Sequence, residues 1–222
     1  MPNLAHQFFF FIVLLGLPSL CFSASSFSGG YQVFDLQSAT VQDASISGFG
    51  MGADYLLLPD TVGPLDVGLG SSAFIGNAAW KNGTIERAGF LNEVTFDLLL
   101  DYADKDVFYL AGLKIPVYSE MLMSGAFNTN TTQGNLESTS EATYTGSGSD
   151  LYFGAEYLVG YLKAFSANLQ TTLGFEYSIV SRSFAIDNTT VVSSFSDYSG
   201  PVANTTELSG TSMKFSVKFR IN

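Results

Sequence analysis

The last eleven residues of the chain alternate strictly between two kinds of side chain. The apolar set comprises Met213, Phe215, Val217, Phe219 and Ile221, and the polar set contains serines together with Lys214, Lys218 and Arg220. Successive side chains of a β-strand point to opposite faces, so as a strand this stretch has one apolar and one basic wall. Because most of the chain repeats such an alternation, the sequence predicts an all-β fold.

An apolar block near the N-terminus predicts export. Residues 8–20 are largely apolar and are followed by small residues at 23–26. About thirteen apolar residues suit the hydrophobic region of a signal peptide and fall short of the roughly 20 that a transmembrane helix needs. We therefore predict a cleaved signal peptide over 1–24 and a mature chain over 25–222. Cys21 leaves lipid attachment open as an alternative, although Leu20 precedes it where a small residue is usual.

The predicted mature chain is acidic and lacks both cysteine and histidine, because Cys21 and His6 lie in the signal peptide. No disulfide can brace the fold. Nine basic against twenty acidic residues give a net charge of -11, which argues against nucleic acid as a partner. Outside the N-terminal block no apolar run is long enough for a spanning helix, so a membrane crossing must use strands.

Eight segments are predicted as strands, and their connections differ in length. The segments are 29–38, 46–58, 65–75, 89–102, 107–118, 150–162, 167–181 and 211–222. The second, fourth and sixth connections are short (59–64, 103–106 and 163–166), whereas the fifth and seventh each have about thirty residues. Transmembrane barrels have short periplasmic turns and long outer loops. We therefore predict an eight-stranded antiparallel up-and-down transmembrane β-barrel with short periplasmic turns and long extracellular loops.

Charged residues and glycines share one phase of these strands, and the apolar residues share the other. A basic residue facing lipid costs roughly 2–4 kcal/mol at the bilayer midplane, so the charged phase is predicted to face the lumen. The residues predicted there are Asp35, Asp54, Asp66, Glu93, Asp97, Asp101, Lys114, Glu156, Glu176, Lys214, Lys218 and Arg220.

Buried charges must be paired, and neighbouring strands suggest how. The cations of the last strand would meet Glu176 on the preceding strand and Asp35 on the first, whereas Lys114 would meet the acids of segment 89–102. One hypothesis is a salt-bridge network that plugs or constricts the lumen. The alternative is that these groups only hydrate a narrow cavity.

Two further sets of residues have expected positions at the ends of the barrel. Tyr55, Tyr102, Tyr109 and Tyr161 share the apolar phase beside the short turns, which predicts an aromatic girdle at the periplasmic membrane interface. Met121, Leu122, Met123 and Phe127 begin the fifth connection. They are predicted either to line a hydrophobic mouth or to pack on the barrel rim.

At this point the chain resembles the small eight-stranded outer-membrane proteins typified by OmpX, OmpW and the OmpA transmembrane domain. The stretches 48–55 (GFGMGADY), 152–157 (YFGAEY) and 214–221 (KFSVKFRI) are the most similar. The resemblance implies a location in the outer membrane of a Gram-negative-type bacterium. It also implies contacts with lipid and lipopolysaccharide, insertion by the barrel-assembly machinery, and a monomeric state.

Several functions are compatible with this resemblance. The outer-membrane enzymes of similar size use a histidine, which the mature chain lacks, and phosphate-loop, dinucleotide and zinc signatures are absent. We therefore expect neither catalysis nor a cofactor or metal. A scaffold displaying acidic loops to a host or surface ligand, an OmpW-like conduit for small or hydrophobic molecules, and a soluble lipocalin-like barrel all remain open.

Overall fold

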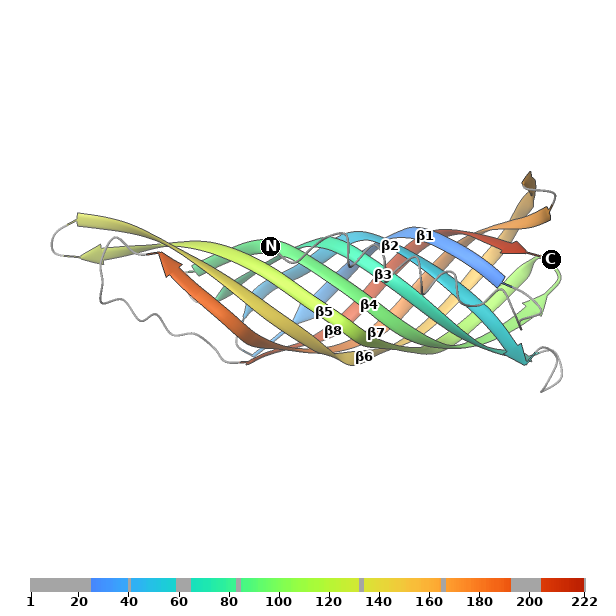
Figure 1. Cartoon of the computed structure of the whole chain (residues 1–222), viewed down its shortest axis with the longest axis horizontal. Coiled ribbons are helices and arrows are strands. Elements are labelled where there is room, and N and C mark those ends of the chain that lie inside the picture. Colours follow the sequence, from blue (N-terminus) through green and yellow to red (C-terminus); the bar gives the residue numbers. More distant parts are fainter. Residues whose placement is uncertain are drawn as a thin grey trace.

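In a computed structural model, eight antiparallel strands form one closed barrel in chain order (Figure 1). The predicted fold class is therefore confirmed. The strands are β1 (Ser25–Gln37), β2 (Gln42–Leu58), β3 (Leu65–Asn82), β4 (Ile85–Asp104), β5 (Val107–Thr131), β6 (Gly134–Ala164), β7 (Ala167–Val192) and β8 (Thr205–Ile221). The structure describes residues 25–39, 41–58, 65–82, 85–131, 134–164, 167–192 and 205–221. The predicted signal peptide lies outside them, and no described helix is long and apolar enough to span a membrane.

The strand register fixes the tilt of the strands. The residues that pair in turn around the barrel, starting from Asp35, are Thr211, Ile179, Leu151, Leu113, Leu98, Leu69, Tyr55 and Ser25. The path returns to β1 at residue 25 after leaving it at residue 35, which is a shear of ten. Because a shear of ten is shared by eight strands, residues at the same height are offset by about 1.25 residues from one strand to the next. The strands are then tilted by about 40° from the barrel axis.

The two longest predicted loops are largely strands in the structure. β5, β6 and β7 have 25, 31 and 26 residues, and β5 and β6 pair as far as Thr131 and Gly134. We name the end of the barrel with the short connections the turn end, and the other end the extension end. Serine, threonine and asparagine occupy both faces of these continued strands, so the hydrophobic alternation that marks a strand is missing there.

The outer surface changes character at one level. Below it, towards the turn end, the outward side chains form an apolar belt that includes Phe49, Ile75, Phe96, Leu98, Leu151, Phe153, Phe175, Ile179, Met213 and Phe215. At the height where this change occurs, corrected for the shear, each of the eight strands has a polar residue that points outward. This polar ring comprises Asp35, Ser47, Asn77, Asn92, Glu120, Ser147, Ser181 and Ser209. Above it, Gln37, Asp43, Glu86 and Glu207 are exposed, together with one apolar pair, Phe90 and Leu122.

The height of the belt matches a lipid bilayer. The outward positions from Ser47 to Tyr55 on β2, and from Asn92 to Tyr102 on β4, span eight to ten residues. At about 3.3 Å per residue and a tilt of about 40°, this is about 20–25 Å. The apolar band of transmembrane barrels is about 25 Å tall. The belt therefore has the dimensions of a membrane-spanning surface, with the polar ring at its upper edge.

The interior changes character at the same level, in the opposite sense. Below the polar ring the lumen holds most of the inward charged side chains, whereas above it a mainly apolar plug, which encloses Arg87 and its hydrogen bond to Tyr144, fills the lumen. Fully or almost fully buried members of the plug are Met121, Met123, Val180, Phe184 and Leu208, together with Trp80, Leu91 and Tyr144. The extension end is thus built like a water-soluble barrel, with its apolar side chains inside.

Candidate functional site in the barrel lumen

Glycines that face the lumen make room for larger side chains of the neighbouring strands. A Cβ added at Gly70 on β3 would lie 2.6 Å from Oδ1 of Asp54, and one at Gly112 on β5 would lie 2.6 Å from the ring of Tyr152. The lumen of an eight-stranded barrel is just wide enough for side chains, so long side chains fit only where other positions carry none. The charged groups therefore meet partners across the barrel as well as on neighbouring strands.

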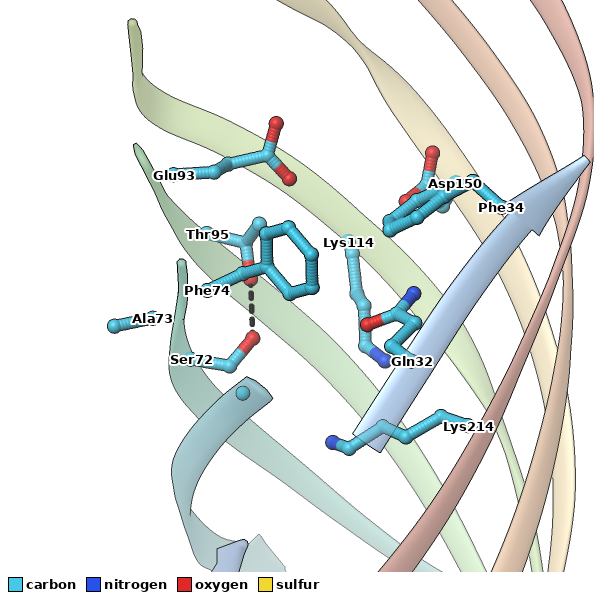
Figure 2. Close-up of a pocket in the computed structure, with 11 residues that line it drawn as sticks. Gln32, Phe34, Ser72, Ala73, Phe74, Glu93, Thr95, Lys114, Asp150 and Lys214 are labelled. Atoms are coloured by element: carbon cyan, nitrogen blue, oxygen red, sulfur yellow. Dashed lines mark hydrogen bonds between the residues drawn. The ribbon is translucent and has the colours of Figure 1, made fainter. Parts of the chain in front are cut away.

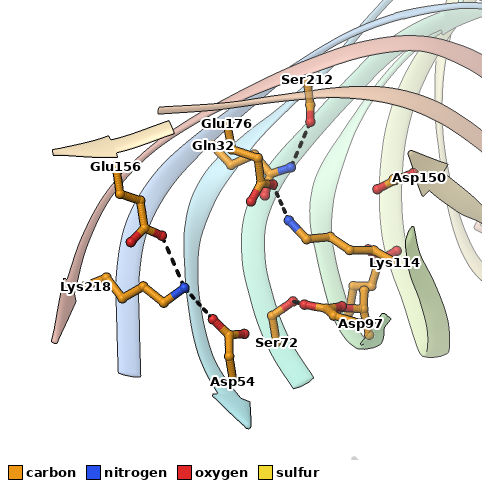
Figure 3. Close-up of polar contacts among 12 residues, drawn as sticks. Gln32, Asp54, Ser72, Asp97, Lys114, Asp150, Glu156, Glu176, Ser212 and Lys218 are labelled. Carbon is orange, nitrogen blue, oxygen red and sulfur yellow. Dashed lines mark hydrogen bonds and ion pairs between the residues drawn. The ribbon is translucent and has the colours of Figure 1, made fainter. Parts of the chain in front are cut away.

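The cluster nearest the turn end joins β2, β4, β6 and β8, and Figure 3 shows Lys218 between Asp54 and Glu156. The ammonium group of Lys218 lies 2.6 Å from Asp54 on β2 and 3.1 Å from Glu156 on β6. Arg220 lies 2.5 Å from Asp101 on β4 and 3.0 Å from Glu156. Glu156 therefore accepts hydrogen bonds from both Lys218 and Arg220 and links them into one network.

A second cluster lies at the middle of the lumen. Lys114 on β5 forms an ion pair with Glu176 on β7, and its ammonium group lies 4.4 Å from the centre of the Tyr152 ring. Asp97 accepts hydrogen bonds from the hydroxyl groups of Thr95 at 2.5 Å and Ser72 at 3.3 Å. This layer couples β5 to β7 across the barrel.

A third cluster lies directly below the apolar plug. Arg182 on β7 donates to both carboxylate oxygens of Glu93, at 3.2 and 2.9 Å, and to both oxygens of Asp150, at 2.7 Å for Oδ2. The three side chains are only 3–4% exposed. One guanidinium thus compensates two carboxylates in a nearly anhydrous layer.

A small cavity separates the second and third clusters (Figure 2). Its lining includes Gln32, Phe74, Lys114 and Lys214, and the space open to the centre of a water molecule is about 20 Å³. That volume suits one or two waters. Among the residues that the structure describes, Lys214 forms no ion pair, whereas Lys114, Arg182, Lys218 and Arg220 do. The buried Arg87, above the polar ring, donates a hydrogen bond to the hydroxyl group of Tyr144 at 3.1 Å. The cavity supplies room for water at this buried ammonium group.

The structure places ten of the predicted lumen residues in or beside these clusters. They are Asp54, Glu93, Asp97, Asp101, Lys114, Glu156, Glu176, Lys214, Lys218 and Arg220. Asp66 shares their phase nearer the turn end, opposite Asp101, and is half-buried.

The lumen position predicted for Asp35 is wrong. Its side chain is exposed on the outer face, in the polar ring, while Phe34 and Leu36 point inward. The reason is its level on β1: at the upper edge of the apolar belt an outward carboxylate meets water, and the inward neighbours join the plug. Charged residues point into the lumen only in the membrane-spanning part of the barrel, and this rule fails at the polar ring and above it.

The expected pairing between neighbouring strands is only part of the observed network. Glu176 pairs with Lys114 rather than with a cation of β8, and the β8 cations reach β2, β4 and β6. Sequence reasoning also missed Arg182 and Asp150. A usable signal exists for both, because Arg182 continues the inward phase of Glu176 on β7, and Asp150 precedes Tyr152 and Glu156 in the inward phase of β6.

All four predicted girdle tyrosines lie on the outer face near the turn end. Tyr102 and Tyr109 pair directly, with ring centres 6.1 Å apart. When the shear is allowed for, Tyr55 lies at their level, whereas Tyr161 lies nearer the turn end. Tyr157, which is 56% exposed on β6, occupies that level instead.

The predicted mouth residues divide between the two faces of β5. Met121 and Met123 are fully buried in the apolar plug, and Leu122 is exposed on the outer wall. The side chain of Phe127 lies outside the described residues. The methionines therefore close the lumen instead of lining an entrance.

The chemistry available to the lumen is that of paired charges. No group of three potential metal ligands that could hold an ion occurs in the described parts of the chain. Every cluster contains both signs, and the carboxylate oxygens of Glu93 and Asp150 are all occupied by Arg182. The arrangement suits the cross-linking of opposite barrel walls.

Solved structures with a similar architecture are outer-membrane and surface proteins. Ail, the attachment invasion locus protein of Yersinia pestis, is 10% identical over 90% of this chain and 99% of its own, with a TM-score of 0.46. The outer membrane protein OprG from Pseudomonas aeruginosa is 10% identical over 90% and 96%, with a TM-score of 0.43. Neisserial surface protein A is 12% identical over 89% and 96%, with a TM-score of 0.38.

No protein-family model matches the chain, and no curated protein matches its sequence. Identities and TM-scores this low carry no functional argument. The barrel architecture stands on the strand pairing of this chain itself.

Proposed function

We propose that this chain is a non-enzymatic outer-membrane barrel with a closed lumen, which anchors the extension of β5, β6 and β7 outside the bilayer. One observation carries the proposal: the ion-pair network meets a close-packed apolar plug at the level of the polar ring. An ion crossing the plug would exchange its hydration shell for mainly apolar side chains.

The apolar belt and the predicted signal peptide support the location. In the proposed orientation the turn end faces the periplasm, so the girdle tyrosines lie at the inner interface and the extension faces outward. Lipid and lipopolysaccharide would contact the belt and its upper edge, and a host or surface ligand would contact the extension. We also propose that the barrel-assembly machinery inserts the chain and that it is a monomer.

The conduit alternative loses its support because Met121 and Met123 are plug residues. The soluble lipocalin-like alternative conflicts with the outer face, where residues such as Phe49 and Ile75 are at least 60% exposed in a continuous belt. Absence of catalysis is supported by the absence of histidine from residues 25–222.

Single-channel recording tests the closed lumen. The refolded protein, inserted in a planar bilayer, is expected to give a flat trace, with a general porin in the same bilayer as the positive control. Discrete conductance steps from the wild-type chain would contradict the proposal.

Cysteine labelling of intact cells tests the location and the orientation. A membrane-impermeant thiol reagent should label a T145C variant on the extension side and leave D106C, in the β4–β5 turn, unlabelled until the outer membrane is permeabilised. Labelling of D106C alone in intact cells would reverse the proposed orientation.

A further inference from the structure

Beyond the closed barrel, strand β7 has a backbone edge to which the described residues supply no partner. Its pairing with β8 ends where Ala185 meets Thr205, yet β7 continues to Val192 and pairs there with β6. In the described part of the chain no strand occupies the other side of Ile186–Val192. The extension end of β7 is seen in Figure 1 beside the longer β5–β6 hairpin.

The sequence of this edge lacks the usual protection against pairing. Exposed edges are normally blunted by lysine, by proline or by inward-pointing charges. Residues 186–192 read IDNTTVV, with no lysine or proline and a single charge at Asp187. Five of the seven residues are β-branched, which favours the extended conformation that an added strand requires.

Another edge without a partner in the described part of the chain, on β5, is less suitable, and the edge of β6 at 134–138 is equally short and begins with glycine and asparagine. The β5 edge runs from Phe127 to Thr131, beyond the pairing of Glu86 with Ala126, and is five residues long against seven. Two of the five are asparagine, a residue depleted in strands. The edge of β7 is therefore the stronger candidate for strand addition.

The chain's own connection between β7 and β8 is a poor occupant of this edge. Residues 193–204 contain Gly200 and Pro201, and proline cannot donate to a strand ladder. A second copy is also disfavoured, because the segments 126–141 and 186–206 contain Glu137, Glu141, Asp187 and Asp197 and neither lysine nor arginine. Two such acidic extensions repel each other, whereas a basic segment is attracted.

We propose that the free edge of β7 at Ile186–Val192 binds an extended segment of another polypeptide that carries lysine or arginine. The segment adds as a strand in the position that β8 leaves beyond Thr205, where backbone hydrogen bonds supply affinity and the acidic extension selects the charge. The inference rests on the proposed function, in which this extension is displayed outside the membrane.

Fluorescence anisotropy with two peptides tests the proposal on the refolded full chain in zwitterionic micelles. One labelled peptide alternates lysine and valine over eight residues; the other replaces each valine by proline, keeping the charge but removing the ability to add as a strand. The lysine–valine peptide is expected to bind at least about tenfold more tightly.

Two matched variants locate the site. N188K/T190K adds two cations at the β7 edge and is expected to weaken binding of the lysine–valine peptide about tenfold or more. N128K/N130K adds the same charge at the β5 edge and is expected to change binding less than about threefold. Heat-modifiable migration on a detergent gel checks that both variants are folded.

Four outcomes overturn the inference: no binding of the lysine–valine peptide, equal binding of both peptides, equal loss in both variants, or self-association without peptide that N188K/T190K abolishes. Each is distinguishable from failure of the proposed function, because conductance of the same preparation reports on the plug alone.

Discussion

Arg182 is predicted to be the most sensitive single charge of the lumen. Replacing it by methionine removes hydrogen bonds to four carboxylate oxygens and leaves Glu93 and Asp150 without a cation. Both acids are 3–4% exposed and lie under the plug, and the cavity that they line has room for only one or two waters, so bulk water cannot replace the guanidinium. Breaking a buried ion pair by removing one partner costs about 3–5 kcal/mol. We expect R182M to lose that much unfolding free energy.

Two control variants separate charge burial from the loss of packing. The triple variant R182M/E93Q/D150N removes the stranded charges together with the cation and is expected to recover all but about 1–2 kcal/mol. K81M removes an exposed cation that lies 3.0 Å from Glu86, and is expected to leave the unfolding free energy close to that of the wild type. The hydrogen bond from Lys81 to Glu86 raises the pKa of Lys81, which stays charged in this comparison.

Equilibrium urea unfolding in zwitterionic vesicles provides the measurement. Trp80 is the single tryptophan, is 3% exposed and contacts Tyr144 edge-on at 5.3 Å, so its fluorescence reports on the plug above Arg182. A loss below about 1 kcal/mol in R182M, or a loss no larger than that of K81M, would refute the reasoning that this triad is buried and mutually compensated.

Three further predictions concern the plug, a glycine that faces the lumen, and the belt. F184A should cost about 3–5 kcal/mol and shift the tryptophan emission to the red, because a fully buried ring is removed; an unchanged spectrum would argue against a close-packed plug. G70L should abolish folding in micelles, whereas G29A, where an added Cβ meets nothing within 4 Å, should fold normally on a heat-modifiability gel; equal folding of both would contradict the packed wall. M213K, within the belt, should cost about 2–4 kcal/mol in vesicles, and E207K, above the polar ring, less than about 0.5 kcal/mol; equal costs would place both in one environment.

The membrane-spanning half of the fold could be predicted from the sequence because its alternation is strict. Met213, Phe215 and Val217 face out, and Lys214 and Lys218 face in, as their spacing predicts. The inward phase of the acids on β4 was equally clear, since Glu93, Asp97 and Asp101 recur every four residues on one face. In these strands the contrast between lipid and lumen leaves only one phase that is energetically acceptable.

The extension end could not be predicted by the same rule, because its surroundings are reversed. Above the polar ring water lies outside, so apolar residues such as Leu208 and Phe184 turn inward while Glu207 turns outward. Along β8 the odd-numbered residues point outward and the even-numbered residues inward. Above the ring the polar Glu207 is outward and the apolar Leu208 inward, the reverse of the arrangement below it. A pattern of outward apolar residues therefore ends at the ring, and the residues beyond it are predicted as loops although they continue the strands.

The partners of the charges could not be predicted either, because they depend on distances across the lumen. Lys114 has three acids on the neighbouring β4, yet its ion pair is with Glu176 on β7. The sequence records which side chains face the lumen, whereas the shear of the barrel decides which of them meet.

The reversal of sidedness at the polar ring is tested most directly by a cysteine scan along β8 in vesicles. We predict that a thiol probe confined to the hydrocarbon phase labels positions 213, 215 and 217, that a water-soluble reagent labels 207 and 209, and that 208 reacts with neither. Labelling of 207 and 209 from the hydrocarbon phase, or of 208 from water, would contradict a soluble-type barrel stacked on a membrane-spanning one.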